Sequence, residues 1–343
     1  MTLWRKPGKV SVIIIDKFDS ERSMSATVSL ISASSYESPV LEASIQQVLA
    51  PLGGIEAFVQ PGAKVLLKPN FLTGSRPTKE CITRPEVTAG VAKLVKAAGG
   101  KPFIGDSPAF GSAQGVAKAN GYLPLLEALE IPIVEFHGKR YKIASETFDH
   151  LRLSKEAMSA DVVINLPKVK SHSQLTLTLG VKNLFGCVPG KMKAWWHMEA
   201  GKDSERFGEM LVETASAIAP NLTLIDGIIG HEGNGPSAGE PRFLGLLGAS
   251  TDVFALDRAL VEILQANPQQ VPTLAASIRQ ELCPHLHEMN FPLETPTALQ
   301  VQDWKLSDQL YAIDFGAPRV LRSLFKHLYI RWIKEPMQAY SSR

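Results

Sequence analysis

Short apolar runs rich in β-branched residues recur along the chain, and polar loops and stretches with helical spacing separate them. A run of about five apolar residues between turn-forming residues is typical of a strand buried on both faces. The runs of this kind lie at residues 10–15, 64–68, 102–105, 131–136, 161–165 and 222–225. Each of them is predicted to be a strand.

The stretches between these runs place apolar residues three and four positions apart, as amphipathic helices do. Thr83 and Glu86 have the spacing of a capping box, which predicts that Thr83 is the N-cap of a helix ending at Gly99. Further helices are predicted over residues 123–130, 209–218 and 253–264.

Strands that alternate with helices predict right-handed crossover connections and a mainly parallel sheet. The predicted fold class is therefore α/β, with a Rossmann-like sheet and helices on both faces, over residues 1–266. Residues 267–343 have a different pattern, in which a proline-rich polar connector precedes a basic amphipathic helix over residues 319–334. Ligands of parallel sheets bind beyond the carboxyl ends of the strands, so the functional site is expected there.

Composition and charge exclude several classes of protein. Of the 343 residues, 45% are hydrophobic and 20% are charged, which is ordinary for a globular protein. The 36 basic and 34 acidic residues leave a net charge of +2, so no nucleic-acid partner is expected. No apolar run reaches the roughly 18 residues of a transmembrane helix. Cys81, Cys187 and Cys283 form no CxxC pair, which indicates a reducing compartment and predicts a cytoplasmic protein.

Polar residues stand at the carboxyl ends of the predicted strands. Lys68 and Asn70 follow the first of them, and both are expected to bind substrate. Asp106 and Asp226 follow two others and are candidates for acid–base catalysis or metal binding. Because the carboxyl ends of parallel strands meet at one edge of a sheet, these four side chains are expected to lie together.

Residues 162–198 contain several cations but no Asp or Glu. Clustered cations and glycines suit a carboxylate or phosphate ligand, because they supply positive charge and backbone N–H groups that a ligand can approach. The cations of this segment are Lys168, Lys170, His172, Lys182, Lys191, Lys193 and His197. We predict a loop here that packs on the protein and binds a small anion.

Within this segment, His172 is the first candidate for proton transfer, because imidazole titrates near neutral pH. Lys182 has no acidic residue nearby in the sequence, so its charge is expected to meet either a carboxylate from elsewhere or a bound anion. In the second case, Lys182→Ala should abolish anion binding and leave the fold intact. The predicted anion-binding residues are Lys168, Lys170, Lys182, Asn183 and Gly190.

A second cluster begins at Asp226, where five glycines up to residue 239 predict a loop that turns sharply or contacts a ligand. Asp226, His231 and Glu232 are candidates for a divalent metal site or for proton transfer, and Asn234 is a candidate for substrate binding. A structural role for Asp226 as a cap of the loop is the alternative. If the three candidates converge with Asp106, a divalent ion should raise the thermal stability.

Three common motifs are absent from the sequence. There is neither the GxGxxG fingerprint of dinucleotide-binding proteins nor the GxSxG elbow of serine hydrolases. Residues 186–191 read GxxxGK, which is one residue shorter than a Walker loop and lacks its metal-binding hydroxyl. The cofactor, if there is one, stays unidentified, with a divalent metal as one candidate.

Several of these segments together resemble the Domain of Unknown Function 362 family over about residues 60–265. The resemblance implies a fold more than a reaction. Many members of that family carry a ferredoxin-like module with cysteine ligands, but this chain has no such run, so no iron–sulfur cluster is expected. The segments that carry the resemblance are residues 68–70, 105–108, 165–172, 182–186, 226–236 and 252–257.

The order of His172, Gly180, Lys182 and residues 189–190 is also similar to that in the lactate racemase family, which implies a small carboxylate substrate. The sequence thus favours an enzyme that acts on a small carboxylated or phosphorylated substrate, as an isomerase, a lyase or an oxidoreductase. The alternative is a non-catalytic or redox-accessory protein. Residues 319–334 are a candidate contact with an anionic membrane surface or a protein partner, or a helix that packs on the core.

Overall fold

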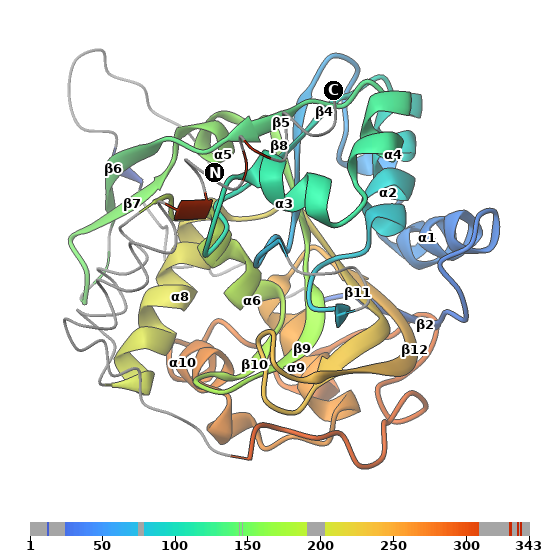
Figure 1. Cartoon of the computed structure of the whole chain (residues 1–343). Coiled ribbons are helices and arrows are strands. Elements are labelled where there is room, and N and C mark those ends of the chain that lie inside the picture. Colours follow the sequence, from blue (N-terminus) through green and yellow to red (C-terminus); the bar gives the residue numbers. More distant parts are fainter. Residues whose placement is uncertain are drawn as a thin grey trace.

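A computed structural model of the chain describes residues 12–13, 25–74, 79–143, 145, 147–190, 203–308, 329–330, 335 and 337. In this part of the chain, the strands form one nine-stranded sheet and one three-stranded sheet (Figure 1). The larger sheet is central and holds the residues of the predicted site. The strands of the central sheet are β2 (Val28–Ser32), β3 (Lys64–Pro69), β4 (Lys101–Asp106), β5 (Ile133–Glu135), β8 (Val162–Leu166), β9 (Lys168–His172), β10 (Thr176–Thr178), β11 (Leu222–Glu232) and β12 (Glu240–Ser250).

The order of the central sheet is β10-β9-β11-β8-β3-β4-β5, and β12 pairs with β11 and β2. All pairs from β9 to β5 are parallel, whereas β10, β12 and β2 add antiparallel edges. The predicted α/β fold with a mainly parallel sheet is therefore confirmed.

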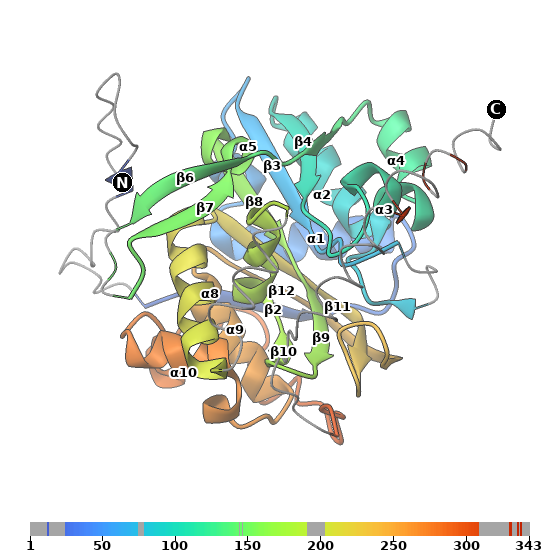
Figure 2. The ribbon, with the colours of Figure 1, turned by 60° about the vertical axis from the view of Figure 1, so that its left-hand side comes forward.

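Helices cover both faces of the sheet, with α2 and α4 on one side and α8 on the other (Figures 1 and 2). β3 shows why both faces need cover, since Val65 and Leu67 pack into one hydrophobic core and Leu66 packs into another. A strand buried on both sides is nearly all apolar, which is the pattern seen in the sequence. The helices are α1 (Val40–Leu49), α2 (Pro85–Ala97), α3 (Ala113–Ala119), α4 (Leu123–Ala128), α5 (Lys155–Ser159), α6 (Gly180–Asn183), α8 (Ser204–Ile218), α9 (Val253–Ile263) and α10 (Pro272–Arg279).

The start of α2 differs from the prediction. Arg84 is the N-cap and no side chain caps the helix, so the predicted capping box of Thr83 and Glu86 is wrong. The hydroxyl of Thr83 instead donates to the carbonyl of Leu166 at 2.6 Å and accepts from the backbone N–H of Asn70 at 2.8 Å. Thr83 therefore links the ends of β3 and β8, and it is not available to the helix.

Two predicted loops are largely strands. Lys168–His172 forms β9, which is buried throughout, and the strand β11 continues through the glycine-rich segment as far as Glu232. Gly227 and Gly230 in β11 serve close packing, because a Cβ at either position would lie within about 3 Å of its neighbours. The glycines therefore allow strands and side chains to approach, and the loop shortens to the residues between β11 and β12.

The small sheet lies apart from the central one and consists of β1 (Val12–Ile13), β6 (Gly138–Ile143) and β7 (His150–Ser154). Of the predicted first strand, residues 12–13 are described, and they pair with β6 in parallel. Within the predicted connector, α10 packs against α8, and its Arg279 makes ion pairs with Glu205 and Glu209.

Most of the predicted basic helix at residues 319–334 lies outside the described residues. Beyond it, the carboxylate of Glu335 accepts hydrogen bonds from the backbone N–H and the hydroxyl of Ser112, the N-cap of α3, at 2.9 and 2.8 Å.

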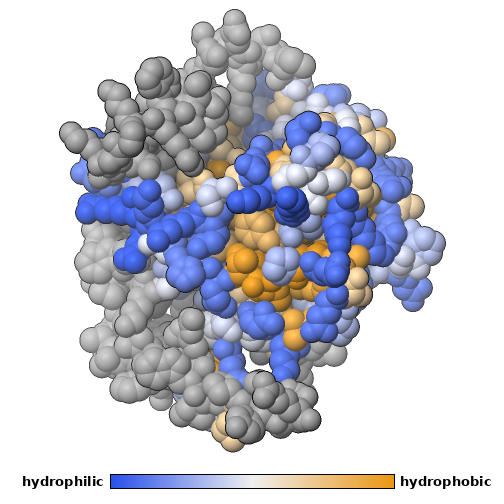
Figure 3. Space-filling model, turned by 90° about the horizontal axis from the view of Figure 1, so that it is seen from above, coloured by the Kyte–Doolittle hydropathy of each residue, from blue (hydrophilic) through white to orange (hydrophobic). Residues whose placement is uncertain are grey.

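In the described residues, no helix is both long and apolar enough to cross a membrane. Seen from above, the surface carries an apolar area bordered by hydrophilic residues (Figure 3).

Candidate functional site

The carboxyl ends of β3 and β4 hold a buried ion pair. Lys68 Nζ lies 3.1 Å from a carboxylate oxygen of Asp106, and the Lys68 side chain is fully buried. Asp106 also accepts hydrogen bonds from the backbone N–H groups of Phe71 and Ser107. The peptide at Gly186 presses against this pair, since a Cβ there would lie 2.0 Å from Asp106 Oδ1 and 2.3 Å from Lys68 Nζ.

Asn183, at the end of α6, joins the ends of β3 and β8 through its amide group. Its Oδ1 accepts from Asn70 Nδ2 at 2.9 Å and from Lys68 Nζ at 3.4 Å. Its Nδ2 donates to the carbonyl of Lys68 and to Asn165 Oδ1. The structure thus brings together Lys68, Asn70 and Asp106, as the strand-end argument predicted, and adds Asn183. The fourth strand-end residue, Asp226, pairs with Lys168 instead.

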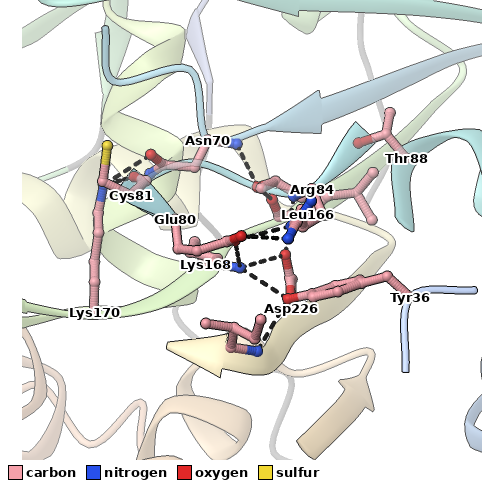
Figure 4. Close-up of polar contacts among 12 residues, drawn as sticks. Tyr36, Asn70, Glu80, Cys81, Arg84, Thr88, Leu166, Lys168, Lys170 and Asp226 are labelled. Atoms are coloured by element: carbon pink, nitrogen blue, oxygen red, sulfur yellow. Dashed lines mark hydrogen bonds and ion pairs between the residues drawn. The ribbon is translucent and has the colours of Figure 1, made fainter. Parts of the chain in front are cut away.

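A second buried ion pair joins β9 to β11 (Figure 4). Lys168 Nζ lies 2.9 Å from Asp226 Oδ2 and 3.5 Å from a carboxylate oxygen of Glu80. Glu80 in turn binds the guanidinium of Arg84 through both of its oxygens. Lys168 therefore pairs with two carboxylates, those of Asp226 and Glu80, and Glu80 also pairs with Arg84.

Tyr36, which precedes α1, completes this second group. Its hydroxyl donates to Asp226 Oδ1 at 2.6 Å and accepts from Lys168 Nζ and from the backbone N–H of Ile229, each at 3.0 Å. Burial first, and the charge of Asp226 second, raise the pKa of Tyr36 far above its usual range. The phenol therefore stays protonated and serves as a hydrogen-bond donor to the carboxylate.

Lys170 lies on the same face of β9 as Lys168. Its ammonium donates to Asn70 Oδ1 at 2.9 Å and to the carbonyl of Cys81 at 2.8 Å, and both acceptors are neutral. Unlike Lys68 and Lys168, it takes part in none of the ion pairs in the described part of the chain. Burial is the main cause that lowers the pKa of Lys170 to about 8.

Two histidines belong to the same edge of the sheet. His172 stands two residues beyond Lys170 on β9, and its Nδ1 accepts the backbone N–H of Gln174 at 3.1 Å. His231 on β11 is the register partner of Lys170 and is fully buried. Burial first, and the charge of Lys170 second, lower the pKa of His231 to about 4, so its ring is neutral at physiological pH.

Lys182 has partners of a kind that the sequence analysis did not consider. Its ammonium lies over the rings of Phe185 and Phe207, 4.3 and 5.2 Å from their centroids, so cation–π contacts stabilise the charge. The carboxylate nearest the start of its helix is that of Asp257, which accepts the N–H groups of Gly180 and Val181 at 2.7 and 3.0 Å. Burial raises the pKa of Asp257 to about 7.

The remaining predicted residues are more scattered. The N–H of Gly190 donates to the hydroxyl of Ser107, which places this glycine next to the end of β4. Asn234 is exposed and bonds to Ser307 and Asp308. Lys191, Lys193 and His197 lie outside the described residues.

The predicted convergence of metal ligands is not seen. Asp226 faces Lys168, Glu232 faces Arg242, and His231 Nε2 accepts the backbone N–H of Gly239. In the described residues, no three side chains of His, Cys, Asp or Glu lie close enough to share a metal ion.

Sequence analysis missed Tyr36, Glu80 and Arg84, which complete the second ion-pair group. The spacing of Glu80 and Arg84, four residues apart with opposite charge, was a local signal that the two side chains meet. No local signal marks Tyr36, because its partner Asp226 lies 190 residues further along the chain.

Comparison with known proteins shows the family of this chain. The thylakoid-associated protein sll1697 of Synechocystis sp. (strain ATCC 27184 / PCC 6803 / Kazusa) is 66% identical to this chain over 320 residues, which cover 93% of this chain and 100% of that protein. The lactate racemase apoprotein from Thermoanaerobacterium thermosaccharolyticum is 14% identical, with a TM-score of 0.44 over 69% of this chain and 57% of its own, so the chain spans a little over half of that protein. The family model described as "Domain of unknown function (DUF362)" matches residues 65–262. The chain therefore belongs to the DUF362 family.

Proposed function

We propose that this protein is an enzyme that acts on a small anionic substrate, carboxylated or phosphorylated, at the carboxyl edge of the central sheet. One observation carries the proposal: Lys170 is a buried ammonium whose protein partners are neutral. An isolated buried charge is costly, by several kcal/mol, unless a counterion accompanies it. A bound anion supplies that counterion.

The other residues of the edge have distinct roles in this proposal. The ion pairs of Lys68 and Lys168 hold Asn70 and the loop that ends at Arg84 in place around Lys170. Asn183 and the backbone of Gly190 contribute polar contacts at the same edge. His172 transfers a proton, because its ring stands on the face of β9 that carries both lysines.

Binding and chemistry are tested separately. Thermal unfolding of the full chain with a panel of small phosphorylated and carboxylated compounds identifies anions that stabilise it. NMR of the stabilising compounds, incubated with the protein, then detects turnover. His172→Gln should keep the stabilisation and lose the turnover. A wild-type protein that no anion stabilises would contradict the proposal.

The variant Lys182→Ala tests where the anion binds, because the Lys182 ammonium already has two aromatic neighbours in the structure. If Lys182→Ala loses the response to anions, the anion site includes this lysine, as the sequence analysis predicted. If Lys182→Ala keeps the response and Lys170→Met loses it, the site is centred on β9.

A second proposal concerns location. We infer that the protein works in the cytoplasm and attaches to an anionic membrane surface through the basic residues 319–334. The name of its 66% identical relative, a thylakoid-associated protein, favours this function. Flotation of the full chain with vesicles that contain anionic lipids, compared with a chain ending at Pro318, is the test. Equal flotation of the two chains would rule out the attachment.

A further inference from the structure

Within the described part of the chain, Lys170 and His231 each have one hydrogen-bond donor for which no acceptor is found. An ammonium has three N–H donors, and Lys170 directs two of them to Asn70 and to Cys81, so a third is left over. His231 Nε2 accepts the N–H of Gly239, which places the ring proton on Nδ1. That Nδ1 is buried and has no hydrogen-bond partner among the described residues.

The two donors belong to neighbouring strands. Lys170 and His231 are register partners in β9 and β11, which run parallel, so their side chains leave the same face of the sheet side by side. Burial lowers the pKa of His231, and the charge of the adjacent Lys170 lowers it further. A backbone hydrogen-bond contribution from Lys79 opposes this shift, whereas Nδ1 itself has no partner at hydrogen-bond distance and angle among the described residues.

Buried donors of this kind rarely lack an acceptor, because each unsatisfied donor lowers the stability by about 1–3 kcal/mol. Here the missing acceptor also has to balance one positive charge, since no carboxylate of the described residues is paired with Lys170. A group with one negative charge and two acceptor oxygens matches these requirements.

We propose that the third N–H of Lys170 and the Nδ1–H of His231 bind one carboxylate group of the ligand. This inference rests on the proposed function and narrows its substrate class from anions in general to carboxylates. A phosphate dianion brings a second charge and further oxygens, for which this pair of residues has neither a cation nor a donor.

The test compares small anions as probes of the full chain. Thermal unfolding is measured at pH 7 and constant ionic strength with formate, acetate, phosphate, sulfate or chloride. Formate or acetate should raise the unfolding temperature of the wild type above its value in chloride, and phosphate and sulfate should not. Lys170→Met should lose this response, whereas Lys101→Met, the same change at an exposed lysine on the opposite edge of the sheet, should keep it.

His231 provides a matched pair of variants that does not depend on removing the lysine. His231→Gln places an acceptor near the Nε2 position and removes the Nδ1 donor, so acetate affinity should fall about tenfold to a hundredfold, as for one hydrogen bond to a charged group. His231→Asn keeps a donor near the Nδ1 position and should bind acetate more tightly than His231→Gln. Isothermal titration of the folded variants measures both affinities.

The outcomes separate this inference from the proposal on which it rests. Stabilisation by phosphate equal to that by acetate, or an acetate response that survives in Lys170→Met, would overturn the carboxylate assignment and leave an anion-binding site. Absence of stabilisation by every anion would overturn both.

Discussion

The two buried ion pairs of the sheet edge differ in how much support each lysine has. Lys68 faces a single carboxylate, that of Asp106, together with a carbonyl and an amide oxygen. Lys168 faces two carboxylates and a phenol, and one of its carboxylates is shared with Arg84. The two lysines are equally buried, but Lys168 has a second carboxylate partner and Lys68 does not. Removing one partner should leave the Lys68 charge isolated but the Lys168 charge still paired.

The largest expected effect concerns Gly186, which backs the pair of Lys68 and Asp106. Gly186→Ala places a methyl group where Asp106 Oδ1 and Lys68 Nζ now lie, so the pair has to separate inside the protein. Urea unfolding should show a loss of more than about 4 kcal/mol, since breaking a buried pair costs about 3–5 kcal/mol before steric strain is added. Gly74→Ala is the control, because its nearest neighbour would be a methyl group at 3.3 Å. Equal losses in both variants would show that the ion pair is not what Gly186 protects.

The next prediction compares the loss of the Asp106 carboxylate with the loss of the Asp226 carboxylate. Asp106→Asn leaves Lys68 without a carboxylate and should lower the free energy of unfolding by about 3–5 kcal/mol. Asp226→Asn leaves Glu80 beside Lys168, so the loss should be clearly smaller. The same urea titrations measure both variants. If Asp226→Asn is the more damaging change, the redundancy of the second group does not stabilise it.

Lys170 should respond to substitution least of the three lysines. Lys170→Met removes a buried charge without leaving a carboxylate behind, so the free energy of unfolding should stay within about 1 kcal/mol of the wild type or increase. Lys68→Met leaves Asp106 unpaired and should lose about 3–5 kcal/mol. A large loss in Lys170→Met would mean that this lysine has a structural counterion.

The pH dependence of stability tests Lys170 in a second way. Because the pKa of Lys170 is lowered from 10.5 to about 8 on folding, the unfolded chain binds more protons between these pH values. The contribution of this residue to stability therefore rises with pH from about 8 to 10.5. Unfolding in urea at pH 7.5, 8.5 and 9.5 should show a shallower rise in Lys170→Met than in the wild type. Parallel curves for the two proteins would contradict the lowered pKa.

Much of the fold is predictable from the sequence because the buried strands are nearly pure apolar runs. Residues 64–68 and 222–225 both correspond to strands of the central sheet, β3 and β11. The polar strand ends were also informative, since Lys68 and Asp106 meet where parallel strands end together. In these cases a local pattern and a general rule about parallel sheets were sufficient.

The rest depends on contacts between distant parts of the chain. β9 contains two lysines and a histidine, so nothing local marks it as a buried strand, and its charges are tolerated only because partners arrive from other elements. Thr83 has the sequence of a cap, yet its hydroxyl is taken by Leu166, 83 residues away. The aromatic partners of Lys182 show the same limit, since Phe207 comes from a different helix.

The hydrogen bonds between Glu335 and Ser112 have a practical consequence for labelling. Met337 lies two residues beyond Glu335 and is exposed, so a label at Met337 stays close to the start of α3. A small dye at this position reports the distance to α3. Its energy transfer to a second dye on α3 falls when the hydrogen bonds between Glu335 and Ser112 break.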